Sequence, residues 1–319
     1  MSVLSKPHFY DEKAAFEHVE SILWADGPVC PHCGNVDKHY KLEGVRSKPS
    51  KKNPEGIERH GLYKCAECRK QFTVRIGTIF EESKLPLHIW LQAIHLVCSS
   101  KKGISSNQLA RVLEITVKSA WFLSHRIREA MRKDEFSLMG GGGGIVEVDE
   151  TFIGKRDVLR GKKLKAHGGG WHKVPVLTLV SRTGEARSFQ VERANRANVL
   201  PIVRKNLDDE ARVITDDSGI YRDFDREYEH AFVVHSKGEY GRGEITTNTV
   251  EGYFSIFKRG MKGVYQHCSE KHLHRYLAEF DFRYSNRVKL GVDDVERSNR
   301  TLAGFKGKRL TYQQSAERA

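Results

Sequence analysis

The sequence predicts an α/β protein in which helices flank a mixed β-sheet. From residue 145 onwards, apolar runs of strand length alternate with amphipathic helical patterns, as in such a sheet. Before this region, two Cys-x-x-Cys pairs and then three helical patterns predict two smaller domains. We therefore divide the chain into residues 1–82, 83–139, 140–144, 145–292 and 293–319.

Charge and hydropathy limit the function. The 319 residues carry a formal net charge of +13, which favours a polyanionic partner and nucleic acid first. An anionic membrane surface is the competing partner, but the most apolar stretch, Leu85 to Cys98, is too short to span a bilayer and contains His88 and His95. The first thirty residues lack the pattern of a signal peptide. We expect a cytoplasmic protein without a membrane partner.

Residues 1–82 combine a helical pattern at Pro7 to Leu23 with a metal-site signature. Four cysteines form the two pairs: Cys30, Cys33, Cys65 and Cys68. Four thiolates make a closed tetrahedral site, so we expect structural Zn²⁺ in a zinc ribbon. A redox dithiol is the alternative reading, which two matching pairs disfavour.

Residues 83–139 contain three helical patterns between Leu85 and Arg132. A short second helix, a brief turn and a longer basic third helix are typical of a helix-turn-helix domain, whose third helix enters a DNA groove. A plain three-helix bundle is the alternative. The candidate DNA contacts on the third helix are Lys118, Trp121, His125 and Arg126.

A predicted strand at Ile145 to Ile153 is central to the second half of the chain. Strand side chains alternate, so Val146 and Val148 share one face while Glu147 and Asp149 share the other. Two carboxylates on one face are costly to bury without protons or cations. The strand therefore predicts either a divalent-metal ligand or a half-exposed acidic face.

Flexible segments are predicted on both sides of this strand. Gly140 to Gly144 is a run of five glycines, which predicts a hinge at a domain boundary. Lys155 to Lys173 is a loop dense in Lys, Arg and Gly. Such loops are usually only solvated, but beside a metal site Lys162, Lys163 and Lys165 would be placed to bind phosphates.

The rest of the sheet is predicted from further apolar runs. Strands are expected at residues 174–180, 186–191 and 211–217, with a helix at 197–207 between the last two. Asp216 lies at the carboxyl end of the last strand, where α/β sheets place their sites.

The next helical pattern carries a carboxylate and a lysine on one face. Glu251 and Lys258 are seven residues apart and share one face of the helix, while an apolar stripe that includes Phe254 lies on another. The simpler interpretation of Glu251 is a capping box with Asn248, and that of Lys258 is a solvated face.

Taken together, these motifs resemble the DDE transposases of bacterial insertion sequences, in the group with an N-terminal zinc ribbon before an RNase H-like catalytic domain. The resemblance covers roughly Pro28 to Arg287. The matching motifs are Val146 to Thr151, Thr215-Asp216, Thr247 to Glu251, Lys258 to Gly260, Gly263 to Tyr265, Tyr276 to Phe280 and Arg283 to Arg287.

The resemblance implies that Asp149, Asp216 and Glu251 bind two Mg²⁺ or Mn²⁺ ions, with Lys258 as the accompanying basic residue. Two ions about 4 Å apart suit both strand hydrolysis and attack by the freed 3′-hydroxyl. The implied partners are the terminal inverted repeats of the element and target DNA, with Arg259 among the DNA contacts. A homodimer in the bacterial nucleoid is also implied.

Several alternatives stay open. A non-enzymatic DNA-binding regulator, or an RNase H-like nuclease that cuts without joining, has the same motifs. Glu150 and Asp217 are one-position alternatives to the assigned acids. His235 falls where the family also has histidine, and a structural role is the simpler one.

The C-terminal part completes the prediction. Lys271 to Arg287 is an amphipathic pattern that we expect to pack over the sheet. Residues 293–319 are polar and basic, so we expect a loosely held tail.

Overall fold

The structure is a computed structural model that divides into two compact units. The first contains residues 1–100, 106–130 and 294–318, and the second contains residues 101–105 and 131–293. The residues described are 2–51, 53–133, 136–157, 172–239 and 241–311. Over these ranges, no helix has the length and hydropathy needed to cross a bilayer.

The first unit contains a small antiparallel sheet and several helices, including the four that the sequence predicted. The sheet has the order β1-β2-β3. Its elements are α1 (Glu12–Leu23), β1 (His39–Leu42), β2 (Leu62–Cys65), β3 (Gln71–Phe72), α2 (Leu87–Ser99), α3 (Ser106–Val112), α4 (Val117–Met131, which ends at the boundary of the unit) and α8 (Asp294–Ala303).

The C-terminal segment differs from the loose tail that the sequence predicted. Residues 294–303 form α8, which packs on α1 and α2. Its Arg297 guanidinium donates to the Cys98 carbonyl oxygen at 2.7 Å, and Phe305 is fully buried beside Phe80 and Trp90. The composition of the tail is polar, but these few buried side chains fix it to the first unit.

The second unit is a five-stranded mixed sheet with the order β6-β5-β4-β7-β8. β4 lies at the centre, antiparallel to β5 and parallel to β7. β8, which the sequence did not predict, pairs in parallel with β7. The elements are β4 (Ile145–Ile153), β5 (Val174–Ser181), β6 (Ala186–Gln190), α5 (Arg196–Asn206), β7 (Arg212–Asp216), β8 (Glu229–Val233), α6 (Asn248–Gly260) and α7 (Leu273–Ser285).

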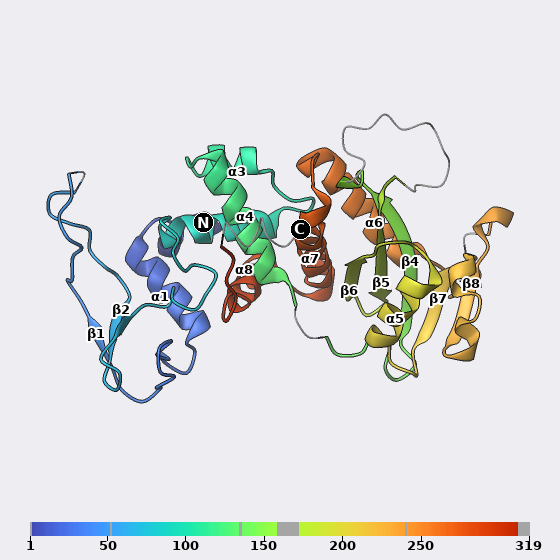
Figure 1. Ribbon diagram of the computed structural model, residues 1–319, viewed down its shortest axis with the longest axis horizontal. Helices are drawn as coiled ribbons and strands as arrows, with labels where there is room; N and C mark the ends of the chain where they lie inside the picture. The colour runs from blue at the N-terminus through green and yellow to red at the C-terminus, as the bar shows by residue number, and fades with distance from the viewer. Residues whose placement is uncertain (1, 52, 134–135, 158–171, 240, 312–319) are drawn as a thin grey trace. The chain divides into compact units, whose positions relative to one another are not determined.

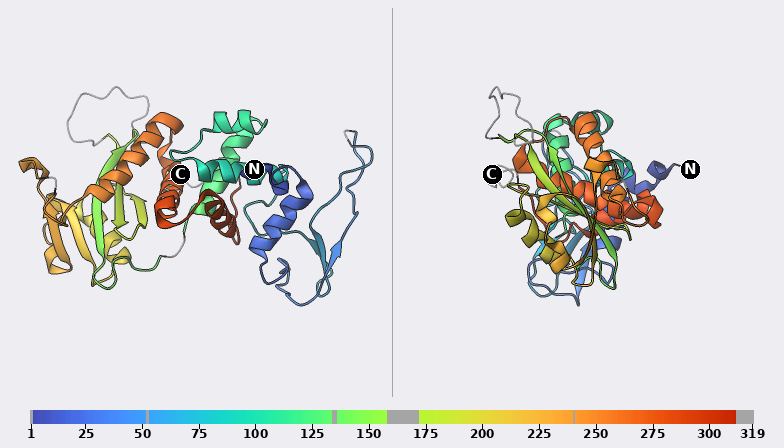
Figure 2. Two further views of the ribbon diagram at one scale, coloured as in Figure 1. Left: turned by 180° about the vertical axis from the view of Figure 1, so that it is seen from behind. Right: turned by 90° about the vertical axis from the view of Figure 1, so that its right-hand side faces the viewer.

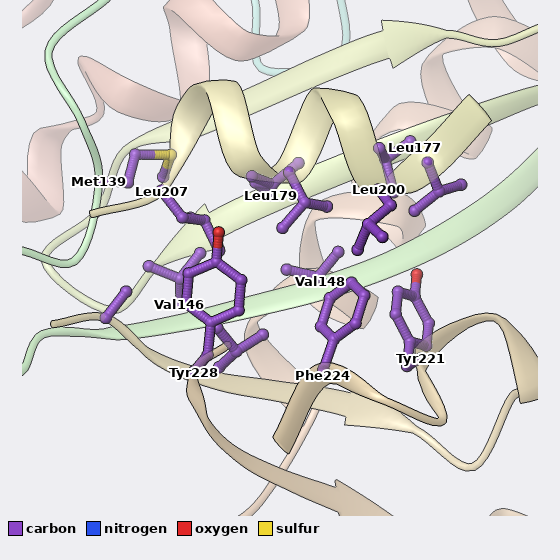
Figure 3. Packing of buried hydrophobic residues seen from close by; sticks show 14 of the residues in the cluster. Met139, Val146, Val148, Leu177, Leu179, Leu200, Leu207, Tyr221, Phe224 and Tyr228 are labelled. Carbon is purple, nitrogen blue, oxygen red and sulfur yellow. The ribbon is translucent and has the colours of Figure 1, made fainter. Parts of the chain in front are cut away.

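Helices cover both faces of this sheet (Figure 1). On one face, α5 packs over Val146, Val148 and their neighbours, together with Tyr221 and Phe224 (Figure 3). On the other face, α6 and α7 enclose a second apolar cluster that includes Val176. The view from behind brings α6 to the near side of the sheet (Figure 2). The predicted packing of the 271–287 helix on the sheet is confirmed, because α7 belongs to this second cluster.

The five glycines form a turn inside the second unit, which differs from the predicted hinge at a domain boundary. The Gly144 amide donates to the Gly140 carbonyl oxygen at 2.9 Å, and the Gly142 amide donates to Glu210 at 3.0 Å. Gly140 has a φ of +84°, and a Cβ there would lie 2.5 Å from the Ala211 Cβ. Glycine is therefore required by backbone conformation and close packing.

Candidate metal and nucleic-acid site

Two acidic side chains lie at matching positions on adjacent strands. β4 and β7 run in parallel with Glu147 opposite Ile214, so two residues further on Asp149 and Asp216 are level with each other. Neighbouring strands are about 4.8 Å apart, which places the two carboxylates side by side at the carboxyl end of β7. The sequence predicted this end as a site, and the register explains why the two acids meet there.

The electrostatic environment of Asp149 is that of a crowded acidic site. Burial, with a smaller contribution from the neighbouring charges of Asp216, Glu150 and Glu251, raises its pKa to about 8. Burial also raises the pKa of Asp216, against the hydrogen bond that its carboxylate accepts from the Ser218 amide. Asp216 and Glu251 therefore both act electrostatically on Asp149, although the three acids come from three separate elements.

Glu251 lies in the first turn of α6, and its side chain is exposed. Oε1 accepts a hydrogen bond from Thr247 Oγ1 at 2.8 Å and lies 3.4 Å from His235 Nε2. His235 also acts electrostatically on Asp216. The histidine, whose role the sequence left open, therefore lies beside two of the three acids.

The two one-position alternatives have different environments. Glu150 points to the opposite face of β4, where its carboxylate accepts a hydrogen bond from the buried Tyr221 hydroxyl at 2.5 Å. Burial raises the pKa of Glu150 to about 7. Asp217 is exposed and accepts a hydrogen bond from Ser236 at 3.2 Å.

Lys258 is within electrostatic reach of Asp149 and also lines a basic groove. Asp149 interacts electrostatically with Lys258, while burial lowers the pKa of this lysine and Lys262 and Lys173 lower it further. A groove of about 510 Å³ runs from the end of β4 to α6, and Lys155 also lines it. The groove is lined by four lysines and by two acidic residues, Asp157 and Glu270, so its lining carries a net positive charge that suits a phosphate chain.

Glu147 was predicted to share the face of Asp149, and it is fully buried there. Its carboxylate accepts hydrogen bonds from the Thr249 and Val250 amides, at 2.7 and 2.9 Å. Asn248 is the first residue of α6 and not its cap, so the capping box that the sequence offered as the simpler interpretation of Glu251 is not formed. The first turn of α6 is instead capped by Glu147 of β4. A contact between such distant residues cannot be predicted from the local sequence pattern.

The four predicted zinc ligands converge. Their sulfur atoms all lie within 4.8 Å of one another, with separations of 3.7 Å between Cys30 and Cys68 and between Cys33 and Cys65. Sulfurs bound to Zn²⁺ at 2.3 Å in a tetrahedron would be about 3.8 Å apart. The cluster therefore has the donor type and spacing of a structural zinc site. Among the described residues, it is the one group of three or more metal-ligand side chains this close together.

The structure corrects part of the DNA contact set predicted on α4. His125 is fully buried, and Arg126 is 5% exposed. The Arg126 guanidinium donates to the Glu81 carbonyl oxygen at 2.5 Å and lies over the Trp90 ring. Both side chains pack inside the first unit, because the basic pattern of the helix did not show which of its faces is buried. Lys118 is exposed, and Trp121 is half-buried.

The other predicted DNA contacts lie in the second unit. Arg259 is exposed on α6 and donates to Ser255 on its own helix. Lys162, Lys163 and Lys165 lie outside the described residues. All these DNA contacts remain predictions.

In comparisons with known sequences, two separate parts of the chain match domains of transposases. Residues 142–285 match the ISXO2-like transposase domain, and residues 10–71 match the transposase zinc-ribbon domain. The first range contains all three acids and Lys258, and the second contains all four clustered cysteines. The sequence and the four-cysteine cluster support a zinc ribbon followed by a transposase domain.

One relative, matched over most of its length, is also a protein of a transposable element. The chain is 25% identical over 294 residues to a protein in transposable element ISH50 of Halobacterium salinarum, covering 86% of this chain and 91% of that protein. The relative is archaeal, whereas the motifs pointed to bacterial insertion sequences.

Two solved structures are weakly similar. They are a pre-cleavage Mos1 transpososome (TM-score 0.27, 15% identity, 69% of this chain and 79% of that chain) and a Mos1 strand transfer complex (TM-score 0.22, 13% identity, 61% and 76%). At these scores neither supports an argument about the fold.

Proposed function

We propose that the protein is a DDE transposase that binds the ends of its element, hydrolyses phosphodiester bonds and transfers the 3′-hydroxyl ends to target DNA. The observation that carries the proposal is the alignment of Asp149 with Asp216 on adjacent parallel strands, with Glu251 and Lys258 of α6 within electrostatic reach of Asp149. The match of residues 142–285 to a transposase domain supports it. The mixed sheet with helices on both faces is compatible with the RNase H-like catalytic domain that the motifs imply.

The donor set fits divalent cations. Mg²⁺ and Mn²⁺ prefer carboxylate oxygens and water, and positive charge would offset the burial and the repulsion that together raise the pKa of Asp149. Among the described residues, the four cysteines are the close group of metal-ligand side chains, and the three acids do not form such a group. A pair of ions about 4 Å apart does not need such a tight set, because the acids can divide between the two.

Each residue has a proposed role. Asp149, Asp216 and Glu251 hold the ions, which when bound activate the attacking oxygen and stabilise the leaving oxygen. Lys258 binds a phosphate of the strand that lies in the groove, next to the acids. Lys118, Trp121 and Arg259, with the 155–173 loop, contribute further DNA contacts.

The test is metal-dependent cleavage of the element's own ends, identified by sequencing the DNA that flanks the gene. We expect Mn²⁺- or Mg²⁺-dependent nicking at the inverted repeats, followed by joining to a target plasmid. Absence of nicking with any DNA would leave a non-enzymatic DNA-binding protein. Nicking without joining would leave an RNase H-like nuclease. Sedimentation of the DNA complex tests the homodimer that the family resemblance implies.

A further inference from the structure

We propose that Glu147 is a positioning residue that holds the first turn of α6, and thereby Glu251, in place opposite Asp149. This inference rests on the proposed function, because it assigns Glu147 to the cation site formed by these acids. It differs from the proposed function in that Glu147 itself binds neither metal nor DNA.

The carboxylate of Glu147 is fully buried, and its contacts are directed at α6 and Arg182. Oε2 accepts the Thr249 and Val250 amides, while Oε1 accepts the Thr249 hydroxyl at 2.8 Å and Arg182 Nε at 3.1 Å. The first amides of a helix have no partner within the helix, and the positive end of the helix dipole favours a negative charge. Glu147 provides both the acceptors and the charge.

Arg182 extends this arrangement to the segment that leads into α6. Its Nη2 donates to the Glu244 carbonyl oxygen at 2.5 Å and to the Thr246 carbonyl and hydroxyl oxygens, at 3.3 and 3.2 Å. The next residue, Thr247, donates its hydroxyl to Glu251 at 2.8 Å. A continuous series of contacts therefore joins Glu147 to the Glu251 carboxylate.

The position of Glu147 in the sequence links both sides of the site. It lies two residues before Asp149 on the same face of β4, and it binds the amides of the two residues that immediately precede Glu251. One buried side chain therefore sets the distance between the strand that carries Asp149 and the helix turn that carries Glu251. Residues that orient metal ligands in this way typically change metal affinity about 10- to 100-fold when replaced.

A role in general stability predicts a different outcome from a positioning role. The apolar side of α6 is fixed to the sheet independently by Val250, Phe254 and Phe257, which are buried in the cluster shared with α7. Loss of the cap should therefore leave α6 in place as a helix while its first turn becomes looser. Glu251 is in that turn, and Lys258 is two turns further along.

The test compares Glu147→Gln with Glu147→Asp, Arg182→Met and a matched control, Glu185→Gln, in the full chain with zinc bound. Glu185 is a half-buried carboxylate just before β6 that pairs with Arg187 and Lys133, and no hydrogen bond or ion pair between it and α6 is found among the described residues. Three quantities are measured for each variant. They are the hydrogen exchange of the α6 amides, the Mn²⁺ affinity by electron paramagnetic resonance and the Mn²⁺ concentration that gives half-maximal nicking.

We expect Glu147→Gln and Arg182→Met to exchange faster in the first turn of α6 and to bind Mn²⁺ roughly 10- to 100-fold more weakly. Saturating Mn²⁺ should restore much of the nicking, and Glu147→Asp should lie between these variants and the wild type. If Glu147→Gln does not fold, Arg182→Met and Glu147→Asp decide the matter.

The inference would be overturned if the folded Glu147 and Arg182 variants bound Mn²⁺ and exchanged their α6 amide hydrogens as the wild type does. An equal loss of Mn²⁺ affinity in Glu185→Gln would also overturn it. A wild-type protein that neither binds Mn²⁺ at the acids nor nicks DNA would instead refute the proposed function. In that case, faster exchange in the variants would still establish Glu147 as the cap of α6.

Discussion

The two candidate metal sites of this chain differ in how complete they are without an ion. In the zinc ribbon, two knuckles bring four sulfurs within 4.8 Å of one another, and the aromatic side chains of Tyr63 and Phe72 pack beside them. In the second unit, Asp149, Asp216 and Glu251 come from two strands and a helix, and they are not part of the close group of ligand atoms found among the described residues.

This difference follows from the chemistry of the ligands. Four thiolates leave no open position on zinc, so the ribbon site can only hold structure. Three carboxylates leave positions for water and phosphate, and their mutual repulsion is tolerated because β4, β7 and α6 are held by packing elsewhere. Zinc binding should therefore stabilise the fold of the ribbon, whereas the buried acids without cations should lower the folding stability of the second unit.

The largest effect is expected at the acids. Asp149→Asn, Asp216→Asn or Glu251→Gln should each lower nicking and joining at least about 1,000-fold, because each removes a charge on which ion binding depends. DNA binding, measured by mobility shift, should be unchanged. Asp217→Asn is the matched control, since this neighbouring acid is exposed and should leave nicking near the wild-type rate.

Loss of zinc should instead unfold a region. Cys65→Ser should lower the zinc content well below one per chain, and hydrogen exchange should become fast across the ribbon, because structural zinc supplies folding free energy. The sheet around β4 should keep its protection from exchange. Cys268→Ser, a cysteine outside the cluster, is the control and should retain one zinc. A zinc-free Cys65→Ser protein whose ribbon amides stay protected from hydrogen exchange would show that zinc is not needed for the fold of the ribbon.

The groove lysines should give a smaller effect. Lys258→Ala or Lys262→Ala should weaken DNA binding roughly 10-fold at physiological salt and reduce the salt slope by about 1, as expected for the loss of one phosphate contact. Lys205→Ala is the control, because this lysine is exposed on α5, away from the groove. Equal slopes for all three variants would show that the groove does not hold DNA.

The smallest effect concerns stability and pH. The pKa of Asp149 is raised from 3.8 to about 8, chiefly by burial, so the folded protein binds this proton more tightly than the unfolded chain does. Without divalent ions, stability should therefore fall as the pH rises from about 4 to about 8. Asp149→Asn removes this dependence and should raise the melting temperature at pH 8 by roughly 5 °C.

Asp209→Asn is the control for this measurement because the side chain is exposed, and it should melt like the wild type. A decrease in the melting temperature of Asp149→Asn at pH 8 would contradict the view that the acidic site is maintained at a cost in stability.

Sequence patterns predicted the parts of the structure that depend on local order. Strand alternation located β4 and the faces of Glu147 and Asp149, and helical spacing located α6. The Cys-x-x-Cys pairs located the cluster, because each knuckle is a local turn. The resemblance to transposases then selected one acid from each element.

The sequence did not predict features that depend on contacts between distant segments. The cap of α6 comes from Glu147, about 100 residues earlier, so Glu251 looked like half of a capping box. Arg126 looked like a DNA contact because basic residues on a helix do not show which face packs inward. The C-terminal segment looked loose because Arg297 and Phe305 find their partners on α2 and near Phe80.

The most direct test is a crystal structure of the protein soaked in Mn²⁺, with anomalous diffraction used to locate the ions. We expect anomalous peaks within coordinating distance of Asp149, Asp216 and Glu251, separate from a zinc peak between the four cysteines. Manganese bound elsewhere on the chain, with these three carboxylates uncoordinated at saturating Mn²⁺, would contradict it.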